Sequence, residues 1–203
     1  MKIILKNKKR FRIIFSTVSV LFLFIFLIIN LYAGSIEYAE EKLSGRTFAN
    51  FNTGCVIKTL GYNSETFSAA VSFYLPNGAL IGSYERAWQG WELKLECIVL
   101  NLKSGAIVFP YRIFSDKSKY GTGVKLFSYY TKGGYPAIYD YSFFQAEEKE
   151  AVNVLFRSAA LSPSLFLFFS SAQKQSIRLR NFHPDTEYAL TVSPSGKIFL
   201  KKN

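Results

Sequence analysis

The sequence predicts a mainly β protein in which an N-terminal transmembrane helix precedes an antiparallel β-sandwich or partly closed barrel with one short α-helix at about 146–160. Three observations support this prediction. An uncharged, apolar run occupies residues 13–36, directly after six cations. Short β-rich runs separated by Gly, Pro, Asn and Ser follow from residue 51 onward. Residues 146–160 instead carry their apolar side chains at helical spacing.

The N-terminal run has the composition of a membrane-spanning helix. Fifteen of the twenty residues in 13–32 are Ile, Leu, Phe or Val, and each contributes roughly −0.3 to −0.6 kcal/mol to insertion near a helix centre. About 20 apolar residues cross about 30 Å of hydrocarbon. Residues 20–29 show no polar face, so a buried core helix is not expected.

The charges on the two sides of this run predict its orientation. Lys and Arg are retained in the cytoplasm, and the first charges after the run are Glu37, Glu40 and Glu41. The six cations before it are Lys2, Lys6, Lys8, Lys9, Arg10 and Arg12. We therefore expect a single-pass protein of the cell (inner) membrane, with its N-terminus cytoplasmic and its C-terminal domain periplasmic or extracellular.

A cleavable signal peptide is the alternative interpretation of the same run. Ala33-Gly34-Ser35 matches the small-x-small pattern of a cleavage site, but the apolar core exceeds the 7 to 15 residues usual for cleaved signals. An uncleaved signal-anchor is therefore favoured. The predicted division is a basic cytoplasmic tail (1–12), the signal-anchor (13–35), a juxtamembrane linker (36–50) and an extracytoplasmic β-domain (51–203). Within the linker, residues 36–43 can prolong the helix, which Ser44-Gly45 would end.

The strands follow in order along the β-domain. Residues 67–75 and 80–88 form a predicted hairpin around Pro76-Asn77-Gly78. In 91–102 the apolar residues alternate with polar ones, which places Cys97 on the inward face. Further strands are predicted at 106–114, 124–130, 137–144, 165–170, 176–181, 188–192 and 197–201.

One helix interrupts the strands. Glu147, Glu148 and Glu150 suit the first turn of a helix, where carboxylates favour the positive end of the dipole. A buried stripe is predicted from Ala151, Val154, Leu155, Ser158 and Ala159. Pro163 would stop the helix.

The two cysteines, Cys55 and Cys97, both lie on the predicted exported side. In an oxidising compartment such a pair is a candidate disulfide, which would stabilise by roughly 4 kcal/mol in the chain-entropy model. Two buried free thiols are the alternative. Neither residue has metal-site spacing, so no metal is expected.

The sequence contains no catalytic motif, and no catalytic residue or cofactor is expected. His183, the only histidine, lies in a His-Pro-Asp tripeptide that resembles the signature loop of J-domain co-chaperones, although predicted β-structure surrounds it. Serine-hydrolase and phosphate-binding patterns are missing as well. The acids in the strand-rich region are Glu85, Glu92, Glu96, Asp116 and Asp140. They are predicted on solvent-facing positions, unless two of them meet in one cleft as hydrolysis by carboxylates requires.

The aromatic residues indicate binding, with core packing as the alternative. Trp88 and Trp91 flank a Gln-Gly turn, and Tyr129, Tyr130 and Tyr135 lie in a lysine-containing stretch. Exposed aromatic residues with polar tips suit sugar stacking, protein interfaces or the membrane surface. These five residues are the candidate binding residues.

The net charge of +11 falls to +5 without the six N-terminal cations. Because nucleic-acid binding needs basic residues clustered on one face, no nucleic-acid partner is expected. The partners expected are the lipid bilayer, through the N-terminal helix, and an envelope protein or glycan. We therefore predict a membrane-anchored binding or assembly module of the cell envelope.

Two alternatives to this prediction remain. One is an anchored hydrolase of envelope polymers that uses Asp or Glu. The other, minor alternative is a lipid-carrying groove protein, because the arrangement of one anchor and one exported β-domain is similar to that of the periplasmic lipopolysaccharide-transport component with a single membrane helix and a jelly-roll groove.

Overall fold

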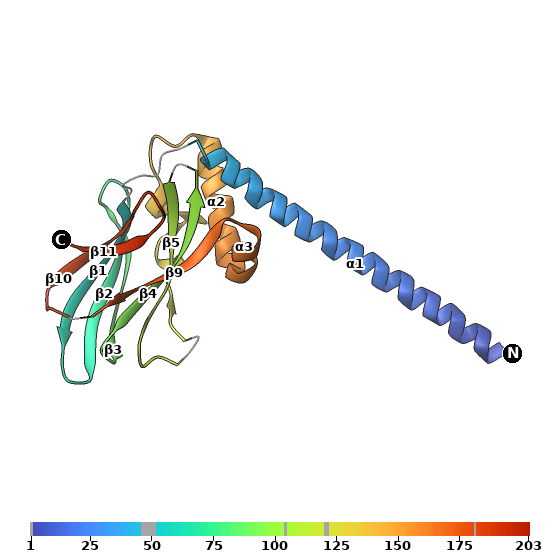
Figure 1. Cartoon of the computed structure of the whole chain (residues 1–203), viewed down its shortest axis with the longest axis horizontal. Helices are drawn as coiled ribbons and strands as arrows, with labels where there is room; N and C mark the ends of the chain where they lie inside the picture. Colours follow the sequence, from blue (N-terminus) through green and yellow to red (C-terminus); the bar gives the residue numbers. More distant parts are fainter. Residues whose placement is uncertain (1, 46–51, 104, 120–121, 181) are drawn as a thin grey trace.

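Three α-helices and two antiparallel sheets make up most of the chain (Figure 1). The structure is a computed structural model that describes residues 2–45, 52–103, 105–119, 122–180 and 182–203, with side chains from Phe15 onward. The predicted mainly β class with an N-terminal apolar helix is confirmed. Along the described residues neither sheet closes into a barrel.

Helix α1 (Lys2–Leu43) runs without interruption from the basic N-terminus into the β-domain. The segment Phe15–Leu43 has a mean hydropathy of 2.3 over its most apolar part, and none of that part is buried. The apolar side chains of residues 20–31 are exposed on every side of the helix. By length and composition this helix can cross a membrane. It ends at Leu43, before a turn at Ser44 and Gly45, as the sequence predicts.

The five-stranded sheet has the order β11-β10-β1-β2-β3. Its strands are β1 (Asn52–Tyr62), β2 (Thr66–Tyr74), β3 (Leu80–Gln89), β10 (Thr186–Val192) and β11 (Ile198–Lys202). The predicted hairpins β2–β3 and β10–β11 are confirmed. Gly78 has a φ of +85° in the first of these turns, a conformation that glycine adopts without steric penalty.

The four-stranded sheet has the order β6-β5-β4-β9. Its strands are β4 (Leu93–Leu102), β5 (Gly105–Ser115), β6 (Val124–Lys125) and β9 (Ala172–Leu179). Cys97 faces the core between the sheets, as the alternation of β4 predicts. Ile98 and Leu100, on the opposite face of β4, are fully buried as well. The helices cover that part of the sheet, and Phe109 of β5 packs edge-on against Phe156.

The predicted strand 137–144 is wrong, and of the predicted strand 124–130 only β6 (Val124–Lys125) forms. After the short β6 the chain forms a 3-10 helix (Phe127–Tyr129), a two-stranded ribbon of β7 (Thr131–Lys132) and β8 (Tyr135–Pro136), and a second 3-10 helix (Ala137–Tyr139). Side chains replace a neighbouring strand along β5. The Tyr130 hydroxyl donates to the Pro110 carbonyl at 2.9 Å, and the Tyr139 hydroxyl bonds both backbone groups of Val108 at 2.8 Å. These hydrogen bonds satisfy backbone groups on the edge of β5 where β6 does not pair with it.

Helix α2 (Ala146–Leu161) confirms the predicted helix, and its start carries a capping box between Gln145 and Glu148. Its buried stripe includes Val152 and Phe156, while Val154 is half-buried. The strand predicted at 165–170 is wrong, because this segment forms helix α3 (Pro163–Phe169). Pro163 does stop α2, and it then occupies the first turn of α3, where its missing N–H is no loss.

The start of the predicted linker 36–50 is a docked helix. Ile36, Ala39 and Leu43 lie on one face of α1 and are buried against α2. At the ends of this contact, Lys42 Nζ lies 2.8 Å from Glu147 Oε2, and the Tyr32 hydroxyl donates to the Ser158 carbonyl at 3.4 Å. The apolar helix is thus continuous with the core of the β-domain. Residues 46–51 of the predicted linker lie outside the described residues.

The predicted disulfide is absent. Cys55 and Cys97 are free thiols with no exposed surface in the hydrophobic core. Burial raises the pKa of Cys55 to about 12 and holds that of Cys97 well above its usual value. The thiolate that disulfide formation requires is therefore suppressed, and both residues pack as small hydrophobes.

Candidate binding site at the loop end of the strands

Four loops meet at one end of the two sheets and line an open pocket of about 680 Å³. We call it the end pocket. Its lining residues are Tyr62, Trp91, Glu92, Asp116, Arg180, Phe182 and His183. Leu93 pairs with Leu179 beside the pocket, whereas Leu100 pairs with Ala172 where α3 meets β9. Seven residues of β4 separate the two pairs, so the end pocket lies about 23 Å along the strands from the helical end.

The two tryptophans have different environments. Trp88, one residue before the end of β3, is 5% exposed, whereas Trp91 is 63% exposed and lines the end pocket. Gly90 lies between them with a φ of +118° and donates its N–H to the Glu65 carbonyl at 2.9 Å. The turn between β3 and β4 thus reverses the chain and leaves one indole in the core and the other in solvent.

Asp116 fixes this turn. Its Oδ1 accepts the backbone N–H of Trp91 at 2.9 Å and that of Glu92 at 3.1 Å, while its own N–H donates to the Glu92 carbonyl at 3.0 Å. A Cβ atom at Gly90 would lie 2.1 Å from Asp116 Oδ1, so only glycine fits there. Partial burial opposes ionisation of Asp116, but the backbone hydrogen bonds outweigh it and lower the pKa of the carboxyl.

Stacked aromatic rings support the apolar wall of the pocket. Phe182 stacks on Phe67 with ring centroids 4.1 Å apart, and Phe67 stacks on Trp88 at 5.9 Å. Tyr62, at the end of β1, is 64% exposed. The apolar wall of the pocket therefore combines Phe182, which is stacked on the core, with the exposed rings of Tyr62 and Trp91.

Charged groups form the opposite wall. The side chain of Glu92 is 12% exposed, and its Oε1 lies 3.4 Å from Arg178 Nε and 3.6 Å from Arg180 Nε. This oxygen accepts no hydrogen bond from the described residues. Both arginines are more than half exposed. Of these groups, the Glu92 side chain and the Arg180 guanidinium line the end pocket, whereas Arg178 is not among its lining residues.

The loop that carries His183 is held by backbone contacts. The Thr59 hydroxyl lies within hydrogen-bonding distance of the His183 carbonyl and of the Thr186 carbonyl, the latter at 3.1 Å. Asp185 adopts a positive φ of 55° in this loop. The imidazole is exposed at the mouth of the pocket.

The predicted binding residues do not form one site. Tyr130 is fully buried, Tyr129 packs edge-on against Tyr84 at 5.3 Å, and the Tyr135 hydroxyl donates to the Tyr139 carbonyl at 2.8 Å. Trp88 borders a separate cavity of about 490 Å³ between β3 and β5. Trp91 alone among the five lines the end pocket.

Sequence reasoning missed Tyr62, Arg180 and Phe182 as lining residues. They lie at the ends of β1 and β9, and only the fold brings them beside Trp91. The one available signal was the position of Tyr62 directly before the Asn63-Ser64 turn.

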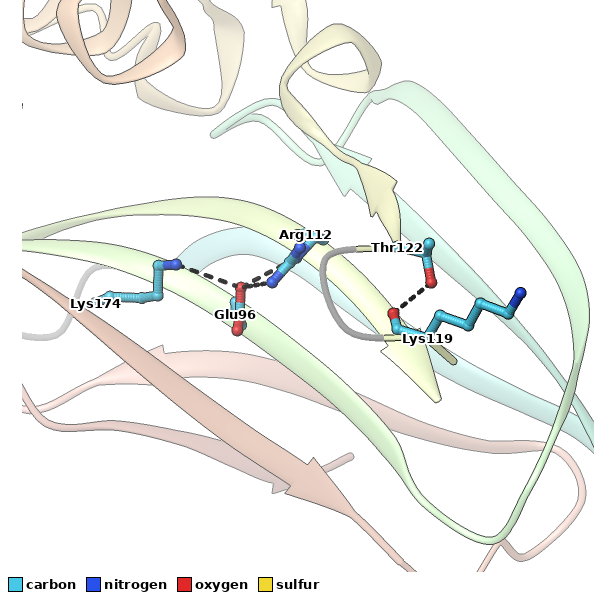
Figure 2. A network of polar contacts seen from close by, with 5 residues as sticks. All are labelled: Glu96, Arg112, Lys119, Thr122 and Lys174. Atoms are coloured by element: carbon cyan, nitrogen blue, oxygen red, sulfur yellow. Dashed lines mark hydrogen bonds and ion pairs between the residues drawn. The ribbon is translucent and has the colours of Figure 1, made fainter. Parts of the chain in front are cut away.

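The five candidate acids are distributed over separate places. Figure 2 shows Glu96 between Arg112 and Lys174 on the outer face of the four-stranded sheet, with Oε2 2.8 Å from Arg112 Nη2 and 3.9 Å from Lys174 Nζ. Asp140 pairs with Lys149 at 2.7 Å, and Glu85 is exposed on β3. Only Glu92 and Asp116 line one cavity together.

The described part of the chain contains no cluster of three or more His, Cys, Asp or Glu side chains with metal-binding geometry. Comparison with known proteins gives no match to a family model, a curated protein or a solved structure.

Proposed function

We propose that this chain is a membrane-anchored binding module that holds a glycan of the cell envelope in its end pocket, outside the cytoplasm. In this proposal α1 is the anchor, and the two sheets act as a sandwich-type scaffold that presents the pocket. The observation that carries the proposal is the exposed Trp91, held beside Tyr62 by the Asp116 turn.

The residues around the pocket support a saccharide ligand. Sugars offer flat C–H faces that pack on aromatic rings, together with hydroxyl groups that need polar partners. Trp91 and Tyr62 provide the rings, and Arg180 and Glu92 provide a donor and an acceptor. Because the turn is already rigid, little conformational entropy is lost on binding.

The place of the pocket supports an extended ligand. The strands of both sheets run across the direction of α1 (Figure 1). If α1 spans the bilayer, the pocket is displaced sideways from the anchor. Such a position suits a polymer that lies along the membrane surface.

A direct test is a titration of the full chain in detergent micelles with soluble peptidoglycan fragments. Trp91 is the exposed indole of the two, so binding is expected to change its emission and to protect it from iodide. Trp91→Ala and Tyr62→Ala are expected to weaken binding at least tenfold. Phe143→Ala is the matched control, because Phe143 is 50% exposed outside the pocket. Unchanged affinity in both pocket variants contradicts the proposed site.

The proposed address is tested separately. A reporter enzyme that is active only outside the cytoplasm is fused after Asn203. The six cations before the apolar segment predict an active fusion. Activity of a cytoplasm-specific reporter at the same position contradicts the orientation.

The second candidate is the hydrolase, which the shared cavity of Glu92 and Asp116 favours. Carboxylate hydrolysis needs one group that remains protonated as a general acid. The lowered pKa of Asp116 opposes that role for this residue. Release of reducing ends from the same fragments, lost in Glu92→Gln without loss of binding, would favour the hydrolase.

No observation favours the lipid-carrying alternative. Aromatic side chains fill the interior beside the sheets, where the rings of Phe73 and Tyr130 lie 4.8 Å apart. Both residues are fully buried.

A further inference from the structure

The end of α2 and the helix α3 expose apolar side chains beside α1. Leu161 is 84% exposed, Leu165 is 51% exposed and Phe168 is 78% exposed. We call these three residues the α3 patch. Residues 158–173, which contain it, include no charged side chain. Large exposed apolar residues in a segment that carries no charge of its own indicate a surface that another apolar phase or molecule covers.

Helix α3, which carries two of the three patch residues, lies beside α2 and near the part of α1 that leaves the β-domain (Figure 1). Phe169 packs edge-on against Tyr32 with ring centroids 6.0 Å apart. Tyr32 lies near the end of the apolar run 13–36, and tyrosine at such a position is typical of the membrane–water interface. Leu31, one residue earlier, is 66% exposed.

The surroundings of α1 therefore indicate what covers the α3 patch. The exposed side chains of residues 20–31 surround α1 on all sides, so they fit lipid better than a single protein surface. The contact between Phe169 and Tyr32 places α3 beside the C-terminal end of this apolar surface. Arg157 is exposed on α2 just before the uncharged segment, where its guanidinium could donate hydrogen bonds to a phosphate headgroup.

We propose that the α3 patch is a second membrane contact, which enters the interface of the same bilayer that holds α1. This inference rests on the proposed anchoring of α1. Short apolar segments of this kind bury about 5–10 Å into the boundary between headgroups and acyl chains. Because α1 is also docked rigidly on α2, two contacts fix the rotation of the β-domain on the membrane and hold the end pocket at one orientation.

The test uses the full chain in vesicles of phosphatidylethanolamine and phosphatidylglycerol. A polarity-sensitive fluorophore is attached at Phe168→Cys, at Phe24→Cys in α1, or at Phe143→Cys. Cys55 and Cys97 are fully buried, so the chain without these substitutions is expected to take up no label. Phe143 is the matched control, because it is an exposed phenylalanine next to the opposite end of α2.

Nitroxide-bearing lipid and aqueous iodide are then compared as quenchers. At position 168 we expect blue-shifted emission. Nitroxide-bearing lipid should quench the fluorescence there at least half as strongly as at position 24, and iodide should quench it little. Position 143 should respond to iodide only. Leu161→Cys, in which the native side chain is the most exposed of the three, should repeat the result of position 168.

The outcomes separate the two proposals. Iodide quenching at position 168 with lipid quenching at position 24 overturns the second contact and leaves the anchor in place. Iodide quenching at position 24 overturns the anchor itself. Protection of position 168 from both quenchers indicates a protein neighbour, such as a second copy of the chain, and also overturns the lipid contact.

Discussion

The two ends of the β-domain both expose aromatic side chains, but in different surroundings. At the helical end, Phe168 lies among Leu161, Leu165 and an uncharged segment. At the loop end, Trp91 lines a pocket with two carboxylates, one guanidinium group and an imidazole. The same class of side chain is thus combined with apolar neighbours at one end and with polar neighbours at the other.

This difference shows how much the neighbours of an exposed ring determine its use. A ring without charges around it gains most from leaving water entirely, as in lipid. A ring beside fixed polar groups can bind a ligand that is itself partly polar. The way each ring is supported differs as well. Backbone hydrogen bonds to Asp116 hold Trp91, whereas Phe168 stands on a helix packed through Phe166 and Phe169.

The largest effect is expected at the helical end, from Ala39→Asp. Ala39 is 1% exposed between α1 and α2, so the variant places a charge without a partner in the helix contact. We expect a loss of about 5 kcal/mol in the free energy of unfolding, at the upper end for an uncompensated buried charge. Thermal unfolding of the full chain in detergent micelles measures it. Tyr38→Asp, one residue earlier at a 59% exposed position, is the control. Equal losses in the two variants would show that the helical end is not docked.

A smaller loss is expected at the loop end from Trp88→Ala. Its indole stacks on Phe67 and is almost fully buried, so truncation should remove about 3 kcal/mol of stability. Trp91→Ala, which removes the same side chain from an exposed position, should change stability by less than about 0.5 kcal/mol. Chemical denaturation of both variants measures the contrast. Comparable losses would contradict the division of the turn into a core residue and a ligand-facing residue.

The next effect concerns the support of Trp91. Asp116→Asn removes the negative charge of the carboxylate, whose Oδ1 accepts two backbone N–H groups. The free energy of unfolding should fall by about 2 kcal/mol at neutral pH. A lowered pKa in the folded chain contributes stability above the ordinary aspartate range, near 3.9, and this contribution disappears as the pH falls through the lowered value. The difference between the two proteins should therefore narrow below about pH 4.

Asp185→Asn is the control for this pH dependence. It makes the same chemical change at an exposed side chain. Asp185 is 81% exposed, and its Oδ1 forms a long ion pair of 3.7 Å with Lys58 Nζ. A gap between the Asp116→Asn variant and the unmodified chain that stays constant from pH 7 to pH 3 would show that the stabilisation does not come from ionisation of the Asp116 carboxyl.

Sequence reasoning succeeded where local chemistry determines the structure. Pro76-Asn77-Gly78 specified a hairpin, because the turn needs a positive φ that glycine supplies. The carboxylates and apolar stripe of α2 specified a helix in the same way. It failed at α3, whose Phe and Leu residues favour a strand, because burial of Phe166 and the contact of Phe169 with Tyr32 outweigh that preference. It also failed after β6, where tyrosine hydroxyls replace a strand along β5.

The candidate site was predictable only in part. Trp91 was identified because it follows a glycine turn, but Trp88 has the same signal and is buried. Tyr62 and Arg180 are far apart in the sequence, and no periodicity connects them. The cysteine prediction failed for a related reason, because Cys55 and Cys97 belong to a core whose burial suppresses the thiolate.

The smallest effect is expected between the two ends of the β-domain, on the outer face of the four-stranded sheet. The helices cover one part of this face, and the next part carries ion pairs. There Glu96 Oε2 accepts hydrogen bonds from Arg112 Nε at 3.1 Å and from Arg112 Nη2 at 2.8 Å (Figure 2). Both side chains are about 15% exposed. Glu96→Gln keeps the shape and one acceptor but loses the charge, so about 1 kcal/mol should be lost. Lys174→Ala should lose less, because its Nζ is 3.9 Å away and its side chain is 44% exposed. A larger loss from Lys174→Ala would show that the exposed cation, and not the shielded Arg112 pair, stabilises this face.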